Sequence, residues 1–330
     1  IGNQFVGKYV SEIGMMFENY ITNPIRPIFW QFIVLVFTCY IVANGVEKGI
    51  EKYSSILVPA LIIIIIILDI RALTLPGASA GIRFLFKPDF SKLDGKVFLD
   101  ALGHSFFSLS LGAGTMITYG SYIKNDEKLG VSALNIALAD TLIAILAGIA
   151  IFPVVFAFGI APNSGPGLVF VTLPNVFPQI PGGYIFAVLF FLLLSLAAIT
   201  STISMLEAVV SFGIDRFNLD RKRASIIFTI LIFIVGVFAS LSNGPLSNIS
   251  FFGNNFLDFL DKLTANYFMT IGSLITIIFV GWRLDKKIVE EQLTNEGIVE
   301  AGYMGTYYFV AKYISPLAIV VVFLASVGII

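Results

Sequence analysis

Charged side chains are scarce in this sequence of 330 residues. Only 12% of the residues are charged, whereas 57% are hydrophobic and 14% are aromatic. A soluble globular domain carries about 25% charged residues, so the composition excludes an ordinary soluble domain. The net charge of −1 gives no basic surplus that would attract nucleic acid. We therefore expect no nucleic-acid partner.

Cysteine and histidine are almost absent. Cys39 is the only cysteine and His104 is the only histidine. A single cysteine excludes an intrachain disulfide, and no cysteine pattern of a zinc or haem site is present. An intramembrane enzyme would need a nucleophile–base pair or a cluster of metal ligands, which this inventory supplies poorly. We therefore expect neither an enzyme nor an organic cofactor.

Long apolar runs dominate the sequence instead. Each is close to the twenty or so residues that cross about 30 Å of hydrocarbon. The runs are 29–45, 56–74, 98–122, 131–158, 184–213, 224–242, 263–282 and 308–330. This pattern predicts an all-α polytopic membrane protein with about eight transmembrane helices.

The distribution of Lys and Arg predicts the orientation, because cytoplasmic loops carry the excess of basic residues. Basic residues occur at Lys48 and Lys52, Lys124 and Lys128, Arg216 and Arg221–Arg223, and Arg283, Lys286 and Lys287. The loops 160–183 and 242–257 contain no Lys or Arg and are expected outside. The long loop 75–97, which mixes acids with bases, is also assigned to the outside.

This orientation puts the N-terminus of the chain outside the membrane. The sequence starts without Met and without a signal peptide. We expect an odd number of further spans upstream, which makes the chain a fragment of a larger transporter.

Two serines and two glycines interrupt the run 98–122, in "FFSLSLGAG". Small residues at this depth allow close helix packing. Alternatively, they open the helix, so that unwound backbone and half-helix ends point into a central site. Irregular backbone is tolerated there only where protein or a cavity surrounds it.

Two further stretches place polar groups inside apolar runs. Asp140 is a carboxyl in "LADTLIAIL", either protonated and hydrogen-bonded to a neighbour or a ligand of a cation. In "AAITSTISM", the hydroxyls either bond back along the helix or join the Ala197 carbonyl with Thr200 and Ser201 at one spot. Oxygen ligands of low total charge favour a monovalent cation over Mg²⁺ or Ca²⁺.

Together these stretches resemble the neurotransmitter:sodium symporter family, in its bacterial amino-acid-transporter branch. The resemblance extends over nearly the whole chain. Its segments, in order, are "GIEKYSSILVP", "FFSLSLGAGTMITYGSY", "LADTLIAILAGIAIFP", "GPGLVFVTLPNVFPQIPGG", "AAITSTISMLEAVVSF" and "YYFVAKYISP". The resemblance implies a fold of two inverted five-helix repeats of the leucine-transporter type.

The resemblance also implies a domain map. The eight expected spans correspond to family helices four to eleven, without the first three. Residues 1–97 would hold the end of the first repeat and an external loop. Residues 98–282 would form the second repeat, and residues 283–330 a cytoplasmic loop and the final helix. The loop 160–183 is similar to the family's external lid.

The resemblance implies two sodium ions and an amino-acid substrate. One sodium site would use Ser108 and Asp140, and the other the Ala197 carbonyl, Thr200 and Ser201. The implied substrate pocket comprises Phe107, Ser108, Ser110, Ala113, Ser201 and Met205. The missing first helix would complete these sites.

The implied gates lie at both faces, and some positions depart from the family pattern. Asp215 and Tyr122 belong to the inner gate, and Asp261 or Asp258 with His104 to the outer gate. Asp140 stands where many members have Asn, and Ala144 offers no charge or hydroxyl one turn later. Ala113 replaces a larger side chain, which implies a roomier pocket.

The expected function is sodium-coupled amino-acid symport across the plasma membrane by alternating access. One alternative is a truncated fragment that is inactive in transport. Another is a different sodium- or proton-coupled transporter of the same fold. A channel would need a continuous polar pore lining, whereas the polar groups of this chain cluster at one depth.

Overall fold

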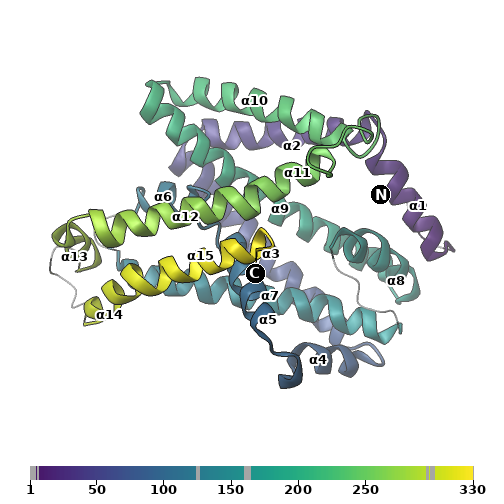
Figure 1. Cartoon of the computed structure of the whole chain (residues 1–330). Helices are drawn as coiled ribbons and strands as arrows, with labels where there is room; N and C mark the ends of the chain where they lie inside the picture. Colours follow the sequence, from purple (N-terminus) through teal and green to yellow (C-terminus); the bar gives the residue numbers. More distant parts are fainter. Residues whose placement is uncertain are drawn as a thin grey trace. The chain divides into compact units, whose positions relative to one another are not determined.

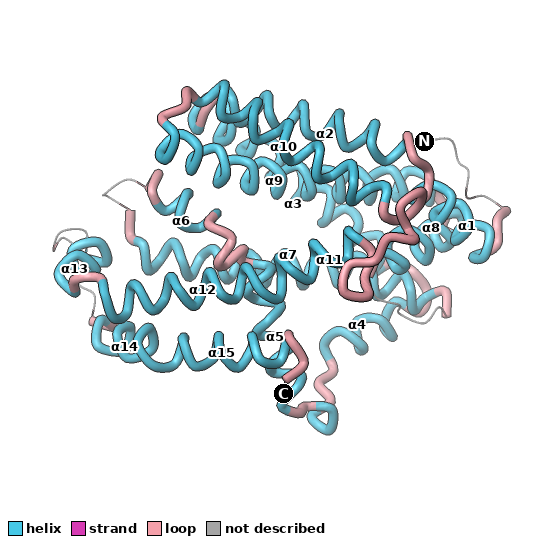
Figure 2. Tube along the Cα trace, turned by 45° about the horizontal axis from the view of Figure 1, so that its top comes forward, coloured by secondary structure: helices cyan, strands magenta, loops and turns pink. Residues whose placement is uncertain are grey.

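The structure is a computed structural model that describes residues 5, 7–123, 127–159, 165–294, 297 and 302–329. These residues are organised almost entirely as helices (Figures 1 and 2). Over these ranges, the one extended pairing is an isolated bridge between Phe251 and Asn254. The predicted all-α class is therefore confirmed.

The helices belong to two compact units. The first unit contains Ile1–Pro88 and Ile143–Leu257, and the second contains Asp89–Leu142 and Asp258–Ile330. The two units are defined by the contacts that their residues make with one another, and not by the internal repeats of the sequence. The repeat boundaries predicted near residues 97 and 282 stay predictions.

The first unit contains the longest helix of the chain as described, α9. Its helices are α1 (Val10–Ile21), α2 (Arg26–Ala43), α3 (Lys52–Leu73), α4 (Ala78–Phe86), α8 (Leu173–Val176), α9 (Gly183–Phe217) and α10 (Arg221–Leu241). Shorter helical turns are η1 (Val46–Glu51), η3 (Leu168–Thr172) and η4 (Phe177–Gln179). Helix α7 (Leu129–Ala157) begins in the second unit and ends in the first.

The second unit contains the interrupted helix. Its helices are α5 (Gly95–Ser108), α6 (Thr115–Gly120), α12 (Met269–Ile278), α13 (Lys286–Thr294), α14 (Met304–Phe309) and α15 (Ser315–Ser326). Its helical turns are η2 (Phe90–Lys92), η5 (Leu263–Phe268), η6 (Phe279–Arg283) and η7 (Val310–Ile314). Helix α11 (Phe256–Lys262) crosses the boundary between the units.

Within the described residues, seven helical segments are long and apolar enough to cross a membrane. They are Arg26–Ala43, Val46–Leu73, Leu129–Ala157, Gly183–Phe217, Arg221–Leu241, Phe256–Arg283 and Met304–Ser326. These seven match seven of the eight expected spans. The remaining one, 98–122, is divided between α5 and α6. The broken-helix interpretation of that run is therefore confirmed.

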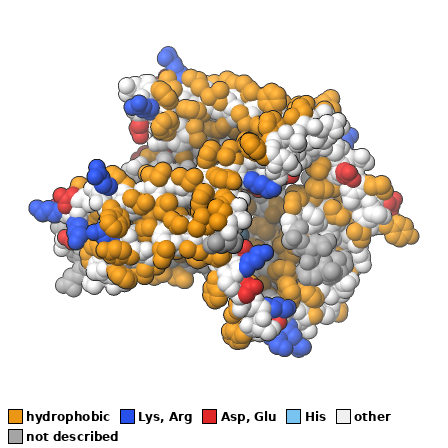
Figure 3. Space-filling model, in the orientation of Figure 1, with side chains coloured by type: hydrophobic (Ala, Val, Ile, Leu, Met, Phe, Trp, Pro, Cys, Tyr) orange, Lys and Arg blue, Asp and Glu red, His pale blue; other side chains and the backbone are white. Residues whose placement is uncertain are grey.

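Continuous helices suit these segments because hydrocarbon offers no partner for backbone N–H and C=O groups. Their outer faces carry large apolar side chains, such as Phe279 and Leu317, which are more than half exposed. Figure 3 shows hydrophobic side chains over much of the visible face of α12 and α15, with basic side chains near α13. This distribution is typical of a lipid-facing surface between two aqueous ends.

The core of the first unit lies where α3, the C-terminal half of α7, α8 and α9 meet. Ile65 of α3, Val155 of α7 and Leu173 of α8 are almost completely buried there. Phe190 of α9 packs on Phe177 with ring centroids 5.6 Å apart. Inside a membrane, such close packing stabilises helix association more than removal from water does.

Three predicted loops are only partly described. In the cytoplasmic loop before the final helix, residues 295–296 and 298–301 lie outside the described residues. Lys124 lies outside the described residues, as does the segment 160–164 of the expected external loop. The rest of that loop, to residue 183, contains η3, α8 and η4. The loop 75–97 contains the short helix α4.

Candidate functional site

The break between α5 and α6 is a segment of left-handed backbone. Ser110, Gly112 and Gly114 have φ angles of 52°, 79° and 80°. The helical hydrogen bonds of α5 end where the Leu111 amide reaches the Phe106 carbonyl at 2.9 Å. They resume when the Thr118 amide reaches the Gly114 carbonyl at 2.9 Å. Glycine adopts positive φ without steric cost, which explains two of the three positions.

Helix α12 supports this unwound segment. A Cβ atom added to Gly112 would overlap the Met269 carbonyl oxygen, and it would lie 2.6 Å from Ser273 Oγ. A Cβ atom added to Gly272 would lie 2.6 Å from the Gly112 carbonyl oxygen. The two backbones therefore approach so closely at Gly112 and Gly272 that neither position has room for a side chain.

Ser273 places an unpaired hydroxyl beside the break. Its side chain is 7% exposed, and its Oγ has no hydrogen-bond partner among the described residues. A buried hydroxyl without a partner is unfavourable, which makes this atom a candidate for binding water or a ligand. The sequence signal for this contact is a group of small residues in an apolar span, Thr270, Gly272 and Ser273. This signal is weak, because small residues are common in membrane helices, and Ser273 was not among the predicted site residues.

The structure brings Ser108 and Asp140 together within the second unit. Ser108 is the last residue of α5, and its Oγ donates a hydrogen bond to Asp140 Oδ1 at 2.6 Å. Asp140, in the N-terminal half of α7, is half-buried. The hydrogen bond uses the serine proton and leaves the lone pairs of Oγ free. A hydroxyl and a carboxylate oriented in this way can both offer oxygen atoms to one cation.

The second predicted group lies on α9 in the first unit. Thr200 Oγ1 donates a hydrogen bond to the Ala197 carbonyl at 2.9 Å. This is the local back-bond that the sequence allowed, and it also puts the two oxygens side by side. The Ser201 side chain is exposed one residue later. The side-by-side position of Ala197 and Thr200 agrees with the expectation, while their role as ion ligands stays a prediction.

The predicted substrate residues are divided between the units. Phe107, Ser110 and Ala113 lie at the break in the second unit, where Phe107 is 54% exposed. Ser201 and Met205 lie on α9 in the first unit, and both are exposed. Each group has the accessibility that ligand binding requires.

The predicted gate residues all lie near the ends of helices or at breaks. His104 is exposed on α5, and Tyr122 follows α6 with its ring 6.4 Å from that of Tyr119. Asp215 is exposed in the last turn of α9, and Asp261 is exposed on α11. Their gating roles stay predictions.

No group of three or more His, Cys, Asp or Glu side chains is placed to hold a metal ion in the described part of the chain. A cation site in these residues would therefore have at most two such side chains, with hydroxyl and carbonyl oxygens as its other ligands. Such a site has low charge, which suits a monovalent cation.

Comparisons with known proteins agree with this chemistry. Residues 5–330 match the model of the Sodium:neurotransmitter symporter family. The sodium-dependent transporter YhdH of Bacillus subtilis is 38% identical over 97% of this chain, and the match covers 71% of YhdH. A sodium-dependent transporter of Haemophilus influenzae is 36% identical over 92% of this chain, which spans 66% of that relative.

A solved structure has the same fold. The crystal structure of MhsT in complex with L-phenylalanine superposes with a TM-score of 0.86 at 40% sequence identity. The match covers 98% of this chain and 73% of the MhsT chain. The inverted-repeat transporter fold implied by the sequence motifs is therefore confirmed, and the chain is a multi-pass membrane protein.

Proposed function

Because this chain belongs to the Sodium:neurotransmitter symporter family, we propose that it carries the ion- and substrate-binding helices of a sodium-coupled amino-acid symporter. The hydrogen bond between Ser108 and Asp140 supports this function most directly. It joins the end of a broken helix to a carboxyl group inside an apolar helix. Both features are costly in lipid, and a binding site for an ion and a solute accounts for them together.

The first sodium ion binds between Ser108 and Asp140. The carboxylate supplies charge and one oxygen, and the serine supplies a neutral oxygen held in position by its hydrogen bond. The second sodium ion binds at the Ala197 carbonyl, Thr200 and Ser201 on α9. Helices of the same protein that precede this chain complete both sites.

The substrate is an amino acid. The break at Leu109–Gly114 offers backbone donors and acceptors for its amino and carboxylate groups, and Phe107, next to the break, contacts its side chain. The relative MhsT was crystallised with L-phenylalanine, which supports an amino-acid substrate of that size. The small Ala113 is consistent with a large apolar side chain.

Alternating access in the plasma membrane couples the two bindings. Sodium favours the conformation in which the break is ordered, and the ordered break binds the substrate more tightly. The two ligands then share one coupling free energy. Basic loops face the cytoplasm, so the segment before α2 is external. His104 and Asp261 act at the outer gate, and Tyr122 and Asp215 act at the inner gate.

The test is sodium-driven uptake of labelled phenylalanine into proteoliposomes. The chain is compared alone and together with the helices encoded upstream of it. Uptake by the extended protein that requires an inward sodium gradient supports the proposal. Asp140→Asn should reduce it at least tenfold, and Asp100→Asn, which removes a carboxyl on α5 two turns before Ser108, should not. Sodium-independent uptake, or uptake of none of the twenty amino acids, would contradict it.

A further inference from the structure

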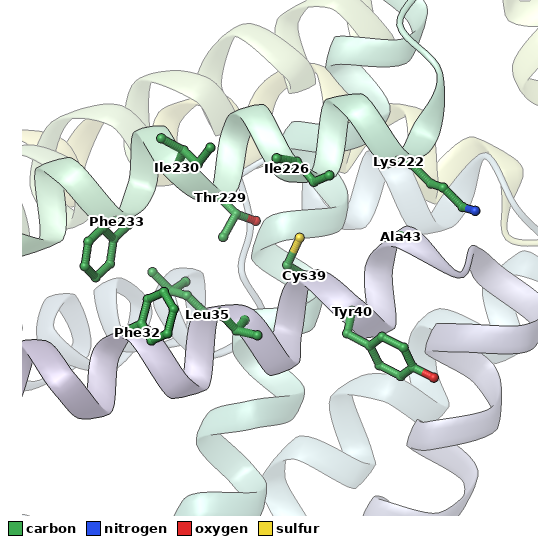
Figure 4. A pocket seen from close by; sticks show the side chains of 11 residues that line it. Phe32, Leu35, Cys39, Tyr40, Ala43, Lys222, Ile226, Thr229, Ile230 and Phe233 are labelled. Carbon is green, nitrogen blue, oxygen red and sulfur yellow. The ribbon is translucent and has the colours of Figure 1, made fainter.

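An open groove lies between α2 and α10 on the first unit. The two helices run side by side in both ribbon views (Figures 1 and 2) and make extensive contacts. The groove has a volume of about 450 Å³. Figure 4 shows Phe32 and Phe233 at one end, Cys39 and Thr229 facing each other in the middle, and Lys222 at the other end.

The length of the groove corresponds to one leaflet of a bilayer. Its lining on α2 extends from Phe32 to Ala43, which is about 16 Å at a rise of 1.5 Å per residue. The hydrocarbon core of a bilayer is about 30 Å thick, so a single leaflet contributes about 15 Å. Both helices are candidate membrane spans. The groove therefore runs from the membrane surface to about the middle of the bilayer.

The two ends of the groove differ in polarity. Lys222 is exposed, and its ammonium group has no ion pair among the described residues. The neighbouring cations are engaged, because Arg221 pairs with Glu207 and Arg223 pairs with Asp220. A lysine at the end of a membrane helix extends toward the lipid headgroups. Its unpaired charge complements a phosphate at that level.

The remaining lining is apolar apart from Thr229 and the ends of Cys39 and Tyr40. The groove is too small to hold a whole helix of another chain. A helical segment 16 Å long and about 10 Å across occupies more than about 1,000 Å³, which exceeds the groove volume of about 450 Å³. A flexible hydrocarbon chain matches both the length and the width.

We propose that this groove binds one acyl chain of an anionic glycerophospholipid, whose phosphate group pairs with Lys222. The acyl chain lies along α2 and α10, past Cys39 and Thr229, and ends near Phe32 and Phe233. The site belongs to the lipid-facing surface and contains none of the residues assigned to sodium or substrate.

Quenching of tryptophan fluorescence by brominated lipids tests the proposal. Ile230 lines the groove, whereas Ile232, exposed on the same helix, does not line it. Each is replaced by Trp in protein in which Trp30 and Trp282 have been changed to Phe. The reporters are reconstituted with mixtures of brominated phosphatidylglycerol or brominated phosphatidylcholine. The quantity compared is the affinity for phosphatidylglycerol divided by the affinity for phosphatidylcholine. We expect this ratio to be several-fold above one for Ile230→Trp and near one for Ile232→Trp.

Three substitutions examine the Lys222 end and the middle of the groove. Lys222→Gln should bring the Ile230→Trp ratio close to one by removing the partner of the phosphate. Thr229→Phe should reduce quenching by both lipids, because the ring fills the groove. Thr229→Val keeps the volume and removes only the hydroxyl, so quenching should not change. Retention of phosphatidylglycerol in native mass spectra should fall in Lys222→Gln and in Thr229→Phe.

Four outcomes would overturn the proposal. Equal lipid preference at positions 230 and 232 would show ordinary annular lipid. A full effect of Thr229→Val would show a ligand that hydrogen-bonds to the hydroxyl, such as a sterol. An unchanged preference in Lys222→Gln would show that the phosphate binds elsewhere. Cross-linking of two copies through Cys39, without quenching at position 230, would show a second copy of the chain in place of lipid.

Discussion

The carboxylate of Glu207 on α9 is completely buried and is held by the guanidinium of Arg221 at the start of α10. Arg221 Nη1 reaches Glu207 Oε2 at 2.7 Å, and both Nη1 and Nη2 reach Oε1 at 3.0 Å. Arg221 Nη1 also lies 3.4 Å from the Val42 carbonyl at the end of α2. One ion pair therefore connects three membrane helices near the end of α9 that carries Asp215.

This ion pair predicts a large and asymmetric loss of stability. Arg221→Met leaves the buried carboxylate of Glu207 without its cation, and breaking a buried pair costs about 3–5 kcal/mol. The double variant Glu207→Gln with Arg221→Met should be more stable than Arg221→Met alone, because no charge is left buried. Thermal unfolding in detergent measures the stability of both variants. Arg223→Met, which breaks an exposed ion pair, is the control. Additive losses would contradict a direct coupling.

The proposed role of Asp140 as an ionised sodium ligand predicts sodium binding that does not require chloride. Opposite charges about 4 Å apart interact by about 4 kcal/mol at an effective dielectric of 20. A neutral side chain at this position would leave the cation unbalanced, and Ala144 offers no substitute charge. We expect equal sodium-dependent substrate binding in chloride and in gluconate. Asp140→Asn should weaken the sodium dependence about tenfold or more, with partial rescue by chloride.

Two results would argue against this role of Asp140. Substrate binding of the unmodified protein that is lost in gluconate would show that an anion, and not the carboxylate, balances sodium. Unchanged sodium affinity in Asp140→Asn would show a protonated structural acid. Ser108→Ala provides an intermediate test, because it removes one neutral oxygen and the hydrogen bond that orients the carboxylate.

The fold and the break could be predicted because their signals are local. Apolar runs of sufficient length predict the spans, and glycines with serines in one run predict the interruption between α5 and α6. The proximity of Ser108 and Asp140 came from family resemblance and not from spacing. Thirty-two positions separate the two residues, and no local pattern determines which helix faces which.

Contacts between distant helices could not be predicted, because each residue also has a local explanation. Thr38 and Thr202 donate to carbonyls of their own helices, as threonines in membrane helices do, yet their hydroxyl oxygens also lie 3.1 Å apart between α2 and α9. Asp69 was not predicted to be buried, because it lies two residues before Arg71 near the end of an apolar run. In the structure it is 6% exposed, and its Oδ1 has no partner among the described residues.

Ala113 predicts the size preference of the substrate pocket. The protein should favour bulky apolar or aromatic amino acids over glycine and alanine. Each methylene of contact changes discrimination by about 1–3 kcal/mol, so the preference should be graded and not absolute. Ala113→Leu should shift the preference toward smaller amino acids. Competition by the twenty amino acids against labelled phenylalanine measures this shift, and tightest binding of glycine to the unmodified protein would contradict it.

The contact between Gly112 and Gly272 predicts that α12 determines the geometry of the break. A methyl group at position 272 would lie 2.6 Å from the Gly112 carbonyl oxygen, so Gly272→Ala must displace the unwound segment. Alanine is a better helix former than glycine by about 1 kcal/mol. A loss of function in Gly272→Ala therefore could not be explained by a weaker helix α12. We expect the apparent affinities for substrate and sodium to fall about tenfold or more, while the protein stays folded.

Two control variants separate this displacement from a general effect of substitution. Gly103→Ala, on α5, adds a methyl group that meets only Val322 Cγ1 at an ordinary 3.6 Å, and it should leave both affinities unchanged. Ser273→Ala removes a buried hydroxyl that has no hydrogen-bond partner within the described part of the chain. If that hydroxyl binds nothing in the working protein, the change is neutral or stabilising, because an unsatisfied buried group is lost. If Ser273→Ala instead weakens substrate binding as much as Gly272→Ala does, Ser273 contacts the ligand or an ordered water. Equal affinities in Gly272→Ala and Gly103→Ala would show that α12 does not position the break.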